Sequence, residues 1–304
     1  MTTQAVVVKS LGMVQLDEIS PQGRSLWKDG WLRLKKDRFA MVCLGIVIFY
    51  ALVAIAAKMG IIASPWDRVV GPSYAPPSFE SLELCMGTDF LGRSVFYKII
   101  HGTRIAMSVG LVSSLIATPV GVILGALAGY FGGWVDDLIT WFYTTLSSIP
   151  NIMLLISIAF VLGKGITAIY VALGVTAWVG LCRVIRGEVI KHKSREYVIA
   201  AESLGATHGS RIFKHILPNV FHFVIINLSI QFMSAIKSEV ILSFLGLGVQ
   251  GQPSWGVMID DAKLELQRGV WWQLAGASVA MFFVVLAFNI LGDALRDALD
   301  PKIK

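Results

Sequence analysis

Charged residues are scarce in this chain of 304 amino acids. Asp, Glu, Lys and Arg make up 15% of it, whereas 55% of the residues are hydrophobic and the mean hydropathy is +0.70. A soluble globule of this size would need far more polar surface to cover its core. The scarcity of charge therefore excludes a soluble enzyme or binding domain and indicates an integral membrane protein.

Cysteine is also scarce, and so are patterns that bind metal. The three cysteines, Cys43, Cys85 and Cys182, are too scattered for a disulfide framework, so we expect free thiols. The five histidines show no metal-ligand spacing beyond one loose set in a basic loop, which a charged surface explains better than a metal does. That set consists of His192, His208 and His215. We expect no bound metal or cofactor.

Several catalytic motifs are missing as well. The chain has no G-x-x-x-x-G-K-[ST] phosphate loop, no H-E-x-x-H and no G-x-S-x-G. We therefore predict no catalytic residues and no means of hydrolysing ATP. The formal net charge of +6 is compatible with a nucleic-acid partner, but in a membrane protein a basic excess marks cytoplasmic loops beside anionic lipid. Nucleic-acid binding is not expected.

Six apolar stretches of about 20 residues fit the thickness of a bilayer core. They are residues 39–57, 105–130, 138–162, 166–182, 220–242 and 272–291. The third is the least regular, because the sequence Ser-Ser-Ile-Pro-Asn at 147–151 interrupts it. The chain is thus predicted to be all-α, with six transmembrane helices.

Basic residues predict the orientation of these helices. Seven Lys and Arg residues lie in the segment 1–38 and seven in the segment 183–218. The positive-inside rule places both segments, and with them both termini, in the cytoplasm. We expect no cleavable signal peptide, because the first 38 residues are polar and basic. The predicted parts are a cytoplasmic segment 1–38 with an amphipathic helix at 25–39, a first span with an outer loop at 39–104, a transmembrane core at 105–292 and a cytoplasmic tail at 293–304.

The outer segment 60–103 is too long for a simple connection and is predicted to cap the outer mouth. Its second half reads as an amphipathic helix after Gly92 that lies at the membrane interface before the second span. The apolar face of that helix would consist of Val95, Phe96, Ile99 and Ile100. An aromatic belt is expected at Trp255, Trp271 and Trp272.

Small residues recur every four positions in the second and fourth spans. The two stripes are Ser113, Ala117, Gly121, Gly125 and Gly129, and Ala168, Ala172, Thr176 and Gly180. Such stripes let helix backbones approach closely in a bilayer, where lipid supplies no hydrophobic driving force. We favour packing inside the bundle over a dedicated subunit interface.

Polar residues form one stripe along the fifth span. They are Asn227, Gln231, Ser234 and Ser238, at i, i+4, i+7 and i+11. Polar groups at membrane depth face the bundle interior or a water-filled path, and the pattern leaves both roles open. The candidate residues of a translocation path are Ser147, Asn151, Asn227, Gln231 and Ser234. Lys237 and Glu239, near the outer end of this span, are assigned to structural pairing with other spans rather than to a proton relay.

A charged segment at 196–218, here called the docking element, separates two long apolar runs. Its first half places Tyr197, Ala200, Ala201 and Leu204 on one helical face. Gly205 is expected to end that helix. Ser210 is the predicted N-cap of a second short helix, which Pro218 closes. A polar helix pair at the membrane surface indicates a site for docking another protein.

The docking element resembles the signature loop of ATP-binding-cassette importer permeases. The family pattern is E-A-A, three residues, Gly, about ten residues and then I-x-L-P. The residues on that spacing are Ala200, Ala201, Gly205, Leu217 and Pro218. Two positions depart, because Ile199 replaces the leading Glu, with Glu202 three residues on, and His215 replaces the Ile. The dipeptide and oligopeptide branch of the family departs there too.

Five further stretches resemble that branch, in the order expected of its C-type permease subunit. They are G-T-D-x-x-G-R at 87–93, A-G-Y-F-G-G at 128–133, E-V-I-L-S-F-L-G-L-G at 239–248, P-S-W-G at 253–256 and N-I-L-G-D-A-L-R-D-A-L-D-P at 289–301. The resemblance implies a type I importer permease in a bacterial inner membrane. It implies five kinds of partner: a homologous second permease, two ATPase subunits, an extracytoplasmic substrate-binding protein, a peptide substrate and the lipid membrane.

The same resemblance implies that the docking element couples the permease to its ATPases. The implied coupling residues are Tyr197, Ala200, Ala201, Glu202, Leu204, Gly205 and Pro218. Import of nickel chelates or glutathione by the same type of complex stays open, because selectivity in this family lies largely in the external binding protein. A self-contained secondary transporter is less favoured, since we see neither clear mid-span charges nor paired broken helices. A scaffold without transport fits the polar stripe poorly.

Overall fold

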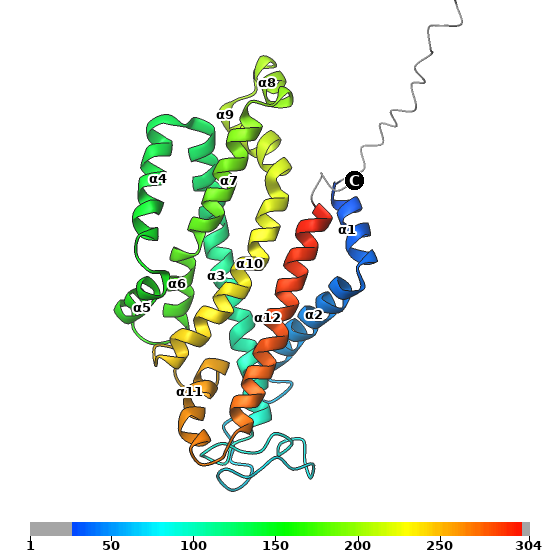
Figure 1. Cartoon of the computed structure of the whole chain (residues 1–304), viewed down its shortest axis with the longest axis vertical. Helices are drawn as coiled ribbons and strands as arrows, with labels where there is room; N and C mark the ends of the chain where they lie inside the picture. Colours follow the sequence, from blue (N-terminus) through cyan, green and yellow to red (C-terminus); the bar gives the residue numbers. More distant parts are fainter. Residues whose placement is uncertain (1–25, 300–304) are drawn as a thin grey trace, which may run out of the picture.

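The computed structural model of the chain describes residues 26–299, with side chains from residue 30 onward, and its architecture is helical (Figure 1). The elements are α1 (Leu26–Lys36), α2 (Arg38–Lys58), α3 (Val95–Phe131), α4 (Gly133–Ser147), α5 (Asn151–Leu162), α6 (Ile166–Thr176), α7 (Trp178–Lys193), α8 (Glu196–Ser203), α9 (His208–Ser210), the π-helix η2 (Arg211–Ile216), α10 (Leu217–Phe244), α11 (Trp255–Leu266) and α12 (Trp272–Leu299). The predicted segment before residue 26 and the end of the predicted tail, residues 300–304, lie outside the described residues.

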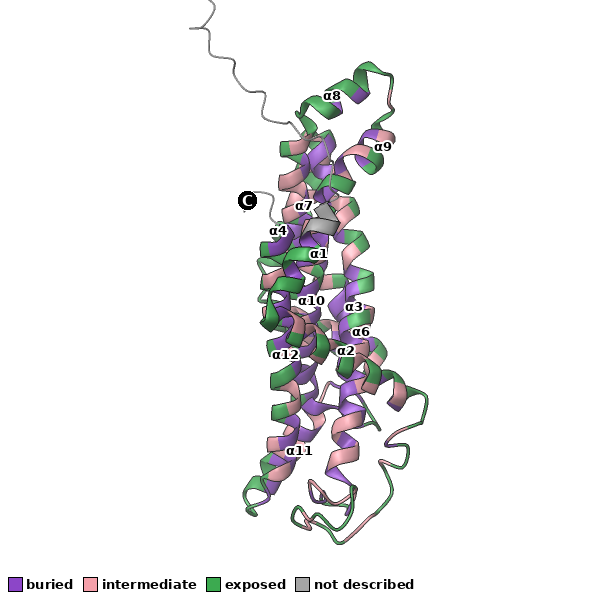
Figure 2. Ribbon diagram, turned by 90° about the vertical axis from the view of Figure 1, so that its right-hand side faces the viewer, coloured by how far each residue is buried: buried purple, intermediate pink, exposed green. Residues whose placement is uncertain are grey.

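Five helical segments within the described chain are long and apolar enough to cross a membrane. They are Arg38–Lys58, Val95–Phe131, Ile166–Lys193, His208–Phe244 and Trp272–Leu299. The pair α4 and α5 passes the same test together but is bent by 88° at its break. The prediction of an all-α membrane protein is confirmed, and a count of six spans holds when this broken pair is taken as one. The helices form an elongated bundle with α8 at one end and α11 near the other (Figures 1 and 2).

Helix α3 is much longer than one span. Its 37 residues measure about 56 Å at 1.5 Å per residue, against a hydrocarbon core of about 30 Å. Ser94 caps its start by accepting a hydrogen bond from the backbone N–H of Tyr97 at 3.3 Å. The prediction of a separate interfacial helix after Gly92 is therefore wrong. Lys98 in its first turn is buried with partners from the outer segment and α12, and the helix continues from there into the span without a break.

The small-residue stripe of α3 packs against α7. A Cβ atom added at Gly121, Gly125 or Gly129 would lie 2.8, 2.6 and 2.6 Å from a backbone carbonyl oxygen of α7. Those carbonyls belong to Trp178, Cys182 and Arg186. Only glycine permits this approach along the whole contact. The expectation that the stripe serves packing inside the bundle is confirmed for these three positions.

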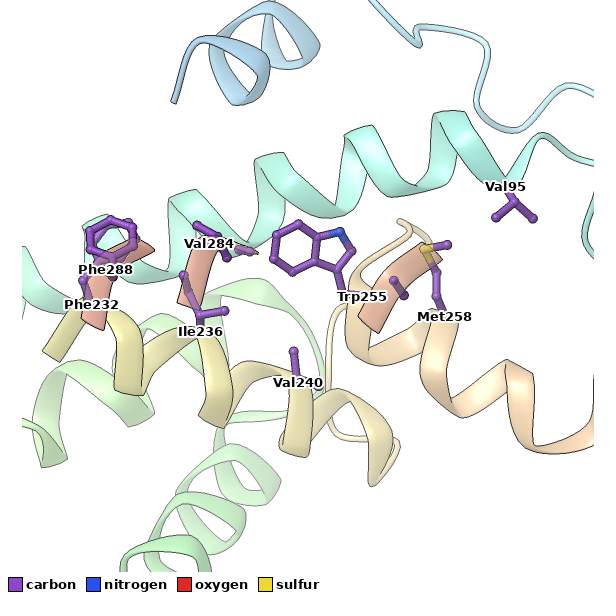
Figure 3. Packing of buried hydrophobic residues seen from close by; sticks show 10 residues of the cluster. Val95, Phe232, Ile236, Val240, Trp255, Met258, Val284 and Phe288 are labelled. Carbon is purple, nitrogen blue, oxygen red and sulfur yellow. The ribbon is translucent and has the colours of Figure 1, made fainter. Parts of the chain in front are cut away.

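A second packing centre joins α3, α10, α11 and α12 around Trp255 (Figure 3). This side chain is fully buried, and its indole N–H donates to the carbonyl of Ile99 at 3.1 Å. Phe232 of α10 stacks on Phe288 of α12 with ring centroids 4.3 Å apart. The prediction that Trp255 belongs to an aromatic belt is wrong, because a partner carbonyl inside the bundle satisfies its polar atom.

Candidate functional site

The first half of the docking element is the short helix α8, and Gly205 ends it as predicted. Gly205 has a φ of +81°, in the left-handed region that glycine adopts at low cost. Its N–H donates to Glu202 O at 2.9 Å, and the next N–H, of Ala206, donates to Ala201 O at 3.0 Å. This pair of bonds is a Schellman motif, which satisfies the last carbonyls of the helix and turns the chain sharply.

The predicted apolar face of α8 is divided between two sides. Ala201, together with Val198, is buried against the rest of the chain. Leu204 is 89% exposed, Tyr197 and Ala200 are also exposed, and Ile199 adds a further exposed apolar side chain. Figure 2 shows α8 as a largely exposed helix at the end of the bundle. The chain thus buries one side of α8 itself and leaves the other without cover among the described residues.

Glu202 fixes the docking element to its own second half. Its carboxylate pairs with the Arg211 guanidinium at 2.6 Å, and that guanidinium lies over the ring of Tyr130, 5.8 Å from the centroid. The Tyr130 hydroxyl also bonds to Nδ1 of His208 at 3.0 Å. Arg211 is buried. Tyr130 therefore joins the end of α3 to the docking element, a role that its position in A-G-Y-F-G-G did not reveal.

The second half of the docking element does not end at Pro218. Thr207, rather than the predicted Ser210, is the N-cap, and its hydroxyl accepts from the N–H of Ser210 at 3.3 Å. The helix then runs through the π-turns of η2 into α10, with Pro218 in the first turn of α10. Proline has no N–H to donate, and its ring would clash with the carbonyl of Lys214 in a regular helix, so the wider π-turn accommodates it. The docking element is thereby continuous with a membrane span.

A cavity of about 480 Å³ lies beside the middle of α10. All five predicted path residues line it: Ser147, Asn151, Asn227, Gln231 and Ser234. Ser238, the last member of the polar stripe, lines it too, and so do Thr176 and Arg183. The stripe therefore faces a cavity shared by four neighbouring helices rather than lipid alone.

Two helix breaks shape this cavity. One is the bend between α4 and α5, and the other is at Ala177 between α6 and α7. The Gln231 side chain donates to the carbonyl of Ala177 at 3.2 Å and accepts from the Thr118 hydroxyl at 3.2 Å. A carbonyl exposed by a helix break needs such a partner. Gln231 therefore has a structural role at the break, whereas Asn227 donates only to Phe223 O of its own helix, at 2.9 Å.

Arg183 is a cavity residue that the sequence analysis assigned to a cytoplasmic loop. It lies within α7, and its guanidinium donates to the Ser147 hydroxyl at 2.8 Å. The same group lies 4.9 Å from the ring centroid of Tyr143 on α4. The signal in the sequence was its place three residues before Arg186, which puts the two arginines on one side of a helix.

The opposite end of the bundle, here called the α11 end, holds a charge cluster that consists of Asp89, Arg93, Lys98, Asp261 and Gln273. Lys98 is 2% exposed and bonds to Asp89 Oδ2 at 3.1 Å and to Gln273 Oε1 at 2.8 Å. Arg93 pairs with the same Asp89 oxygen at 2.8 Å. Burial alone would raise the pKa of Asp89, but the Lys98 and Arg93 cations and backbone donors lower it below its ordinary value.

Glu265 of α11 lies beside this cluster in a different state. It is 2% exposed, and neither carboxylate oxygen has a hydrogen-bond partner among the described residues. Burial raises the pKa of its carboxyl to about 7, and the nearby Lys98 cation only partly offsets that rise. The α11 end therefore holds one carboxyl group that changes its charge near neutral pH.

Glu239 and Lys237 do not face each other, as their spacing requires. Glu239 is fully buried and accepts from the Ser243 hydroxyl of its own helix at 2.7 Å, whereas Lys237 is exposed. Ser254, which precedes α11, bonds to that Ser243 hydroxyl at 3.4 Å. The link from Glu239 to another element is thus a hydroxyl relay rather than an ion pair.

The sequence matches two known protein families. Residues 121–304 match the binding-protein-dependent transport system inner membrane component, and residues 25–77 match the N-terminal TM domain of oligopeptide transport permease C. The first match covers more than half of the chain. The chain belongs to this family of transport system inner membrane components. It is accordingly a multi-pass membrane protein, and the resemblance seen in the docking element is confirmed.

Relatives in this family align with nearly the whole chain. The dipeptide transport system permease protein DppC of Bacillus subtilis is 38% identical over 95% of this chain and 90% of its own length. The oligopeptide transport system permease protein OppC of the same organism is 35% identical over 95% and 93%. The glutathione transport system permease protein GsiD of Pectobacterium atrosepticum is 34% identical over 92% and 93%.

The fold of the family is also found in a solved structure. A chain of the MetNI methionine ABC transporter, in inward-facing conformations, superposes with a TM-score of 0.51 at 19% identity, over 66% of this chain and 94% of that chain. At that identity the likeness concerns the fold alone. It confirms the expected architecture of a type I ABC importer permease.

Proposed function

We propose that this chain is the transmembrane permease subunit of an ATP-driven importer of dipeptides and oligopeptides. The observation that carries the proposal is the 38% identity to a dipeptide permease over 95% of the chain. The cavity lined by the polar stripe of α10 supports it, because a hydrophilic solute needs hydrogen-bonding groups at membrane depth. Selectivity for the solute would be shared with an extracytoplasmic binding protein.

The energy for transport would come from two ATPase subunits bound at the docking element. The chain itself has no phosphate loop, so ATP hydrolysis belongs to those partners. The exposed side of α8, with Leu204 and Tyr197, would enter a groove of the ATPase, and Gly205 would set the angle of entry. Of the other coupling residues, Ala200 and Ala201 form the helix that docks, and Glu202 holds it to Arg211.

Motion of the docking element would reach the cavity through α10. Because η2 and α10 continue the element past Pro218 without a loop, a push on α8 is transmitted to the helix that carries Asn227 and Ser234. ATP favours the closed ATPase dimer, and that difference in affinity supplies the bias for alternating access. A homologous second permease would complete the path on the side that this chain leaves open.

The proposed orientation has both termini in the cytoplasm of a bacterial cell and α8 on the cytoplasmic side of the inner membrane. The basic residues of the segments 183–218 and 1–38 would then lie on the cytoplasmic side, apart from Arg183, which lines the cavity. Residues 39–104 would form the first span and outer cap, 105–292 the transmembrane core, and 293–304 a cytoplasmic tail. The charge cluster at the α11 end would line the outer mouth, near the binding protein.

Glutathione is the second candidate solute, because a glutathione permease is 34% identical to this chain over 92% of its length. Peptides and glutathione share amide bonds, an amino group and carboxylates, so one cavity of polar uncharged groups and one cation suits both. Within the same complex, the binding protein would decide between them.

Two measurements in sequence test the proposal. The chain is first purified from its native membrane in mild detergent, and we expect two ATPase subunits and a second permease to accompany it. The complex with its binding protein is then reconstituted in proteoliposomes, and ATP-dependent uptake of radiolabelled trialanine is compared with uptake of glutathione. Purification without any nucleotide-hydrolysing partner would contradict the coupling role of the docking element, and uptake of glutathione alone would contradict the peptide specificity.

A further inference from the structure

Arg183 is the one charged residue among those that line the cavity beside α10. The other polar side chains of the lining are uncharged hydroxyls and amides. None of the ion pairs found among the described residues includes Arg183. Arg183 is exposed and lies within Ile166–Lys193, a segment long and apolar enough to cross a membrane, and a cation without a carboxylate partner in such a segment marks the path of a solute or an ion.

A neighbouring arginine of the same helix, Arg186, is ion-paired and provides a comparison for Arg183. Arg186, one turn further along α7, holds Asp136 of α4 through two bonds of 2.5 and 2.6 Å. Arg183 has a single hydrogen bond, to the Ser147 hydroxyl, and the face of Tyr143 below it. A guanidinium has five N–H donors in a planar fork, so most of the donors of Arg183 are free within the described chain.

The residues around Arg183 fix the position of its guanidinium without neutralising its charge. Ser147 precedes the bend between α4 and α5, and Tyr143 lies one turn before it on α4. The ring and the hydroxyl position the guanidinium at the cavity wall, where Asn151 and Asn227 add amide groups. Planar bidentate donation to a carboxylate is the interaction for which a free arginine fork is best suited.

We propose that Arg183 binds the carboxylate of the solute as it passes through the cavity and is a specificity-determining residue of the path. The inference rests on the proposed import of peptides and adds to it the chemical group that the path recognises. Every unmodified peptide has a C-terminal carboxylate, and glutathione has two. A solute with this group blocked would lose the interaction, and an acidic residue of the second permease subunit would compete for it.

The test compares a peptide acid with its amide in the complete transporter. Initial rates of ATP-dependent uptake are measured in proteoliposomes for radiolabelled trialanine and for trialanine amide, with the binding protein saturated by each. Any preference of the binding protein is the same for the wild-type chain and its variants, so it cancels when their acid-to-amide ratios are divided. We expect Arg183→Gln to lower the ratio about tenfold, as the loss of a charged hydrogen bond implies. Arg183→Lys keeps the charge but not the planar fork, so it should lower the ratio less than Arg183→Gln does.

Arg186→Gln is the matched control, because it removes a neighbouring guanidinium that is already paired with Asp136. It should lower the uptake of both peptides alike and leave the ratio unchanged. An unchanged ratio in Arg183→Gln would overturn the proposal. The proposal would also be overturned if Arg183→Gln lowered the uptake of both peptides equally and Arg183→Lys restored the uptake of both equally. That result would indicate that the charge of residue 183 serves a contact between subunits.

Failure of the proposed function is distinguishable from failure of this inference. A wild-type transporter that imports neither trialanine nor its amide contradicts peptide import. The same ratio is then measured with glutathione and with glutathione amidated at its glycine carboxyl. A loss of discrimination in Arg183→Gln would support the role of the arginine there, and an unchanged ratio would overturn it.

Discussion

A buried charge cluster at one end of the bundle and an exposed apolar helix face at the other provide the most useful comparison within the molecule. At the α11 end, Asp89 and Lys98 are buried and paired with each other. At the α8 end, Leu204 is 89% exposed and Phe213 is 60% exposed, with nothing in the described chain to cover them. Exposed apolar side chains occur at the α11 end too, where Phe79 is 98% and Leu264 is 70% exposed, so the contrast is between the buried charge cluster and the exposed face of α8. Substitutions in the buried cluster should therefore cost stability, and substitutions on the exposed face of α8 should cost association.

The largest effect on stability is expected at Asp89. Asp89→Ala removes the carboxylate that Lys98 and Arg93 share and leaves the buried Lys98 ammonium with Gln273 and, at 3.7 Å, the more distant carboxylate of Asp261. Breaking a buried pair in this way costs about 3–5 kcal/mol. The melting temperature of the purified chain in detergent should fall by many degrees. Asp67→Ala, at an exposed aspartate of the same outer segment, is the control and should leave it within a degree or two. Equal melting temperatures for both variants would refute the distinction between the ends.

A pH-dependent effect of up to about 3 kcal/mol is expected at Glu265. The folded chain keeps this proton up to a pKa of about 7, whereas the ordinary value is 4.5. The contribution of Glu265 to stability is therefore greatest below pH 4.5 and is lost as the pH rises through 7, because the buried carboxyl must then carry its charge. Glu265→Gln should remove this loss and melt higher than the wild-type chain at pH 8.

The control for that measurement is Glu80→Gln, which changes an exposed carboxyl of the same outer segment. Its melting temperature should follow the wild-type pH profile from pH 4 to pH 8. If Glu265→Gln also follows the wild-type profile, burial of Glu265 does not govern the pH response of the α11 end.

At the α8 end, Leu204→Glu should weaken association without weakening the fold. The side chain touches little of its own chain, so the free energy of unfolding of the isolated chain should change by no more than about 0.5 kcal/mol. A central apolar contact at an interface is worth about 2 kcal/mol, which is roughly a thirtyfold loss of affinity for the ATPase subunits. Pull-down of ATPase by the purified permease measures it. Undiminished pull-down would remove Leu204 from the proposed interface.

At Gly205 a small effect on stability is expected, with a larger one on coupling. A Cβ added at this position meets nothing within 4 Å. The cost of Gly205→Val is therefore the strain of holding valine at a φ of +81°, about 1–2 kcal/mol. The resulting change in the angle of α8 should leave the ATPases bound but reduce the uptake obtained per ATP hydrolysed. Gly205→Asn, which tolerates the left-handed region, is the matched control and should couple normally. Normal coupling in the valine variant would show that the corner at Gly205 does not transmit force.

Local patterns in the sequence were sufficient for several features. Hydropathy placed the spans because burial in lipid acts on each stretch of about 20 residues separately. The C-cap at Gly205 was predictable because a Schellman motif involves only residues within one turn. The stripe from Asn227 to Ser234 was predictable because helix periodicity puts residues spaced by three and four on one face. Which cavity that stripe faces was not contained in the same pattern.

Only the tertiary structure decided features that depend on residues far apart in the chain. The sequence suggested that a helix near Lys98 lies flat on the membrane, but Gln273, which is 175 residues away, gives that lysine a partner inside the bundle. It likewise suggested that Pro218 ends a helix, but the π-turns of η2 carry the helix through it. Arg183 lines the cavity because α7 packs on the glycines of α3 and the chain bends sharply between α4 and α5 beside it. Helix propensity and hydropathy depend on residues that are neighbours in the sequence, so they can be estimated from the sequence alone. A buried charge is stable only where a segment distant in the sequence supplies its hydrogen-bond or ion-pair partner.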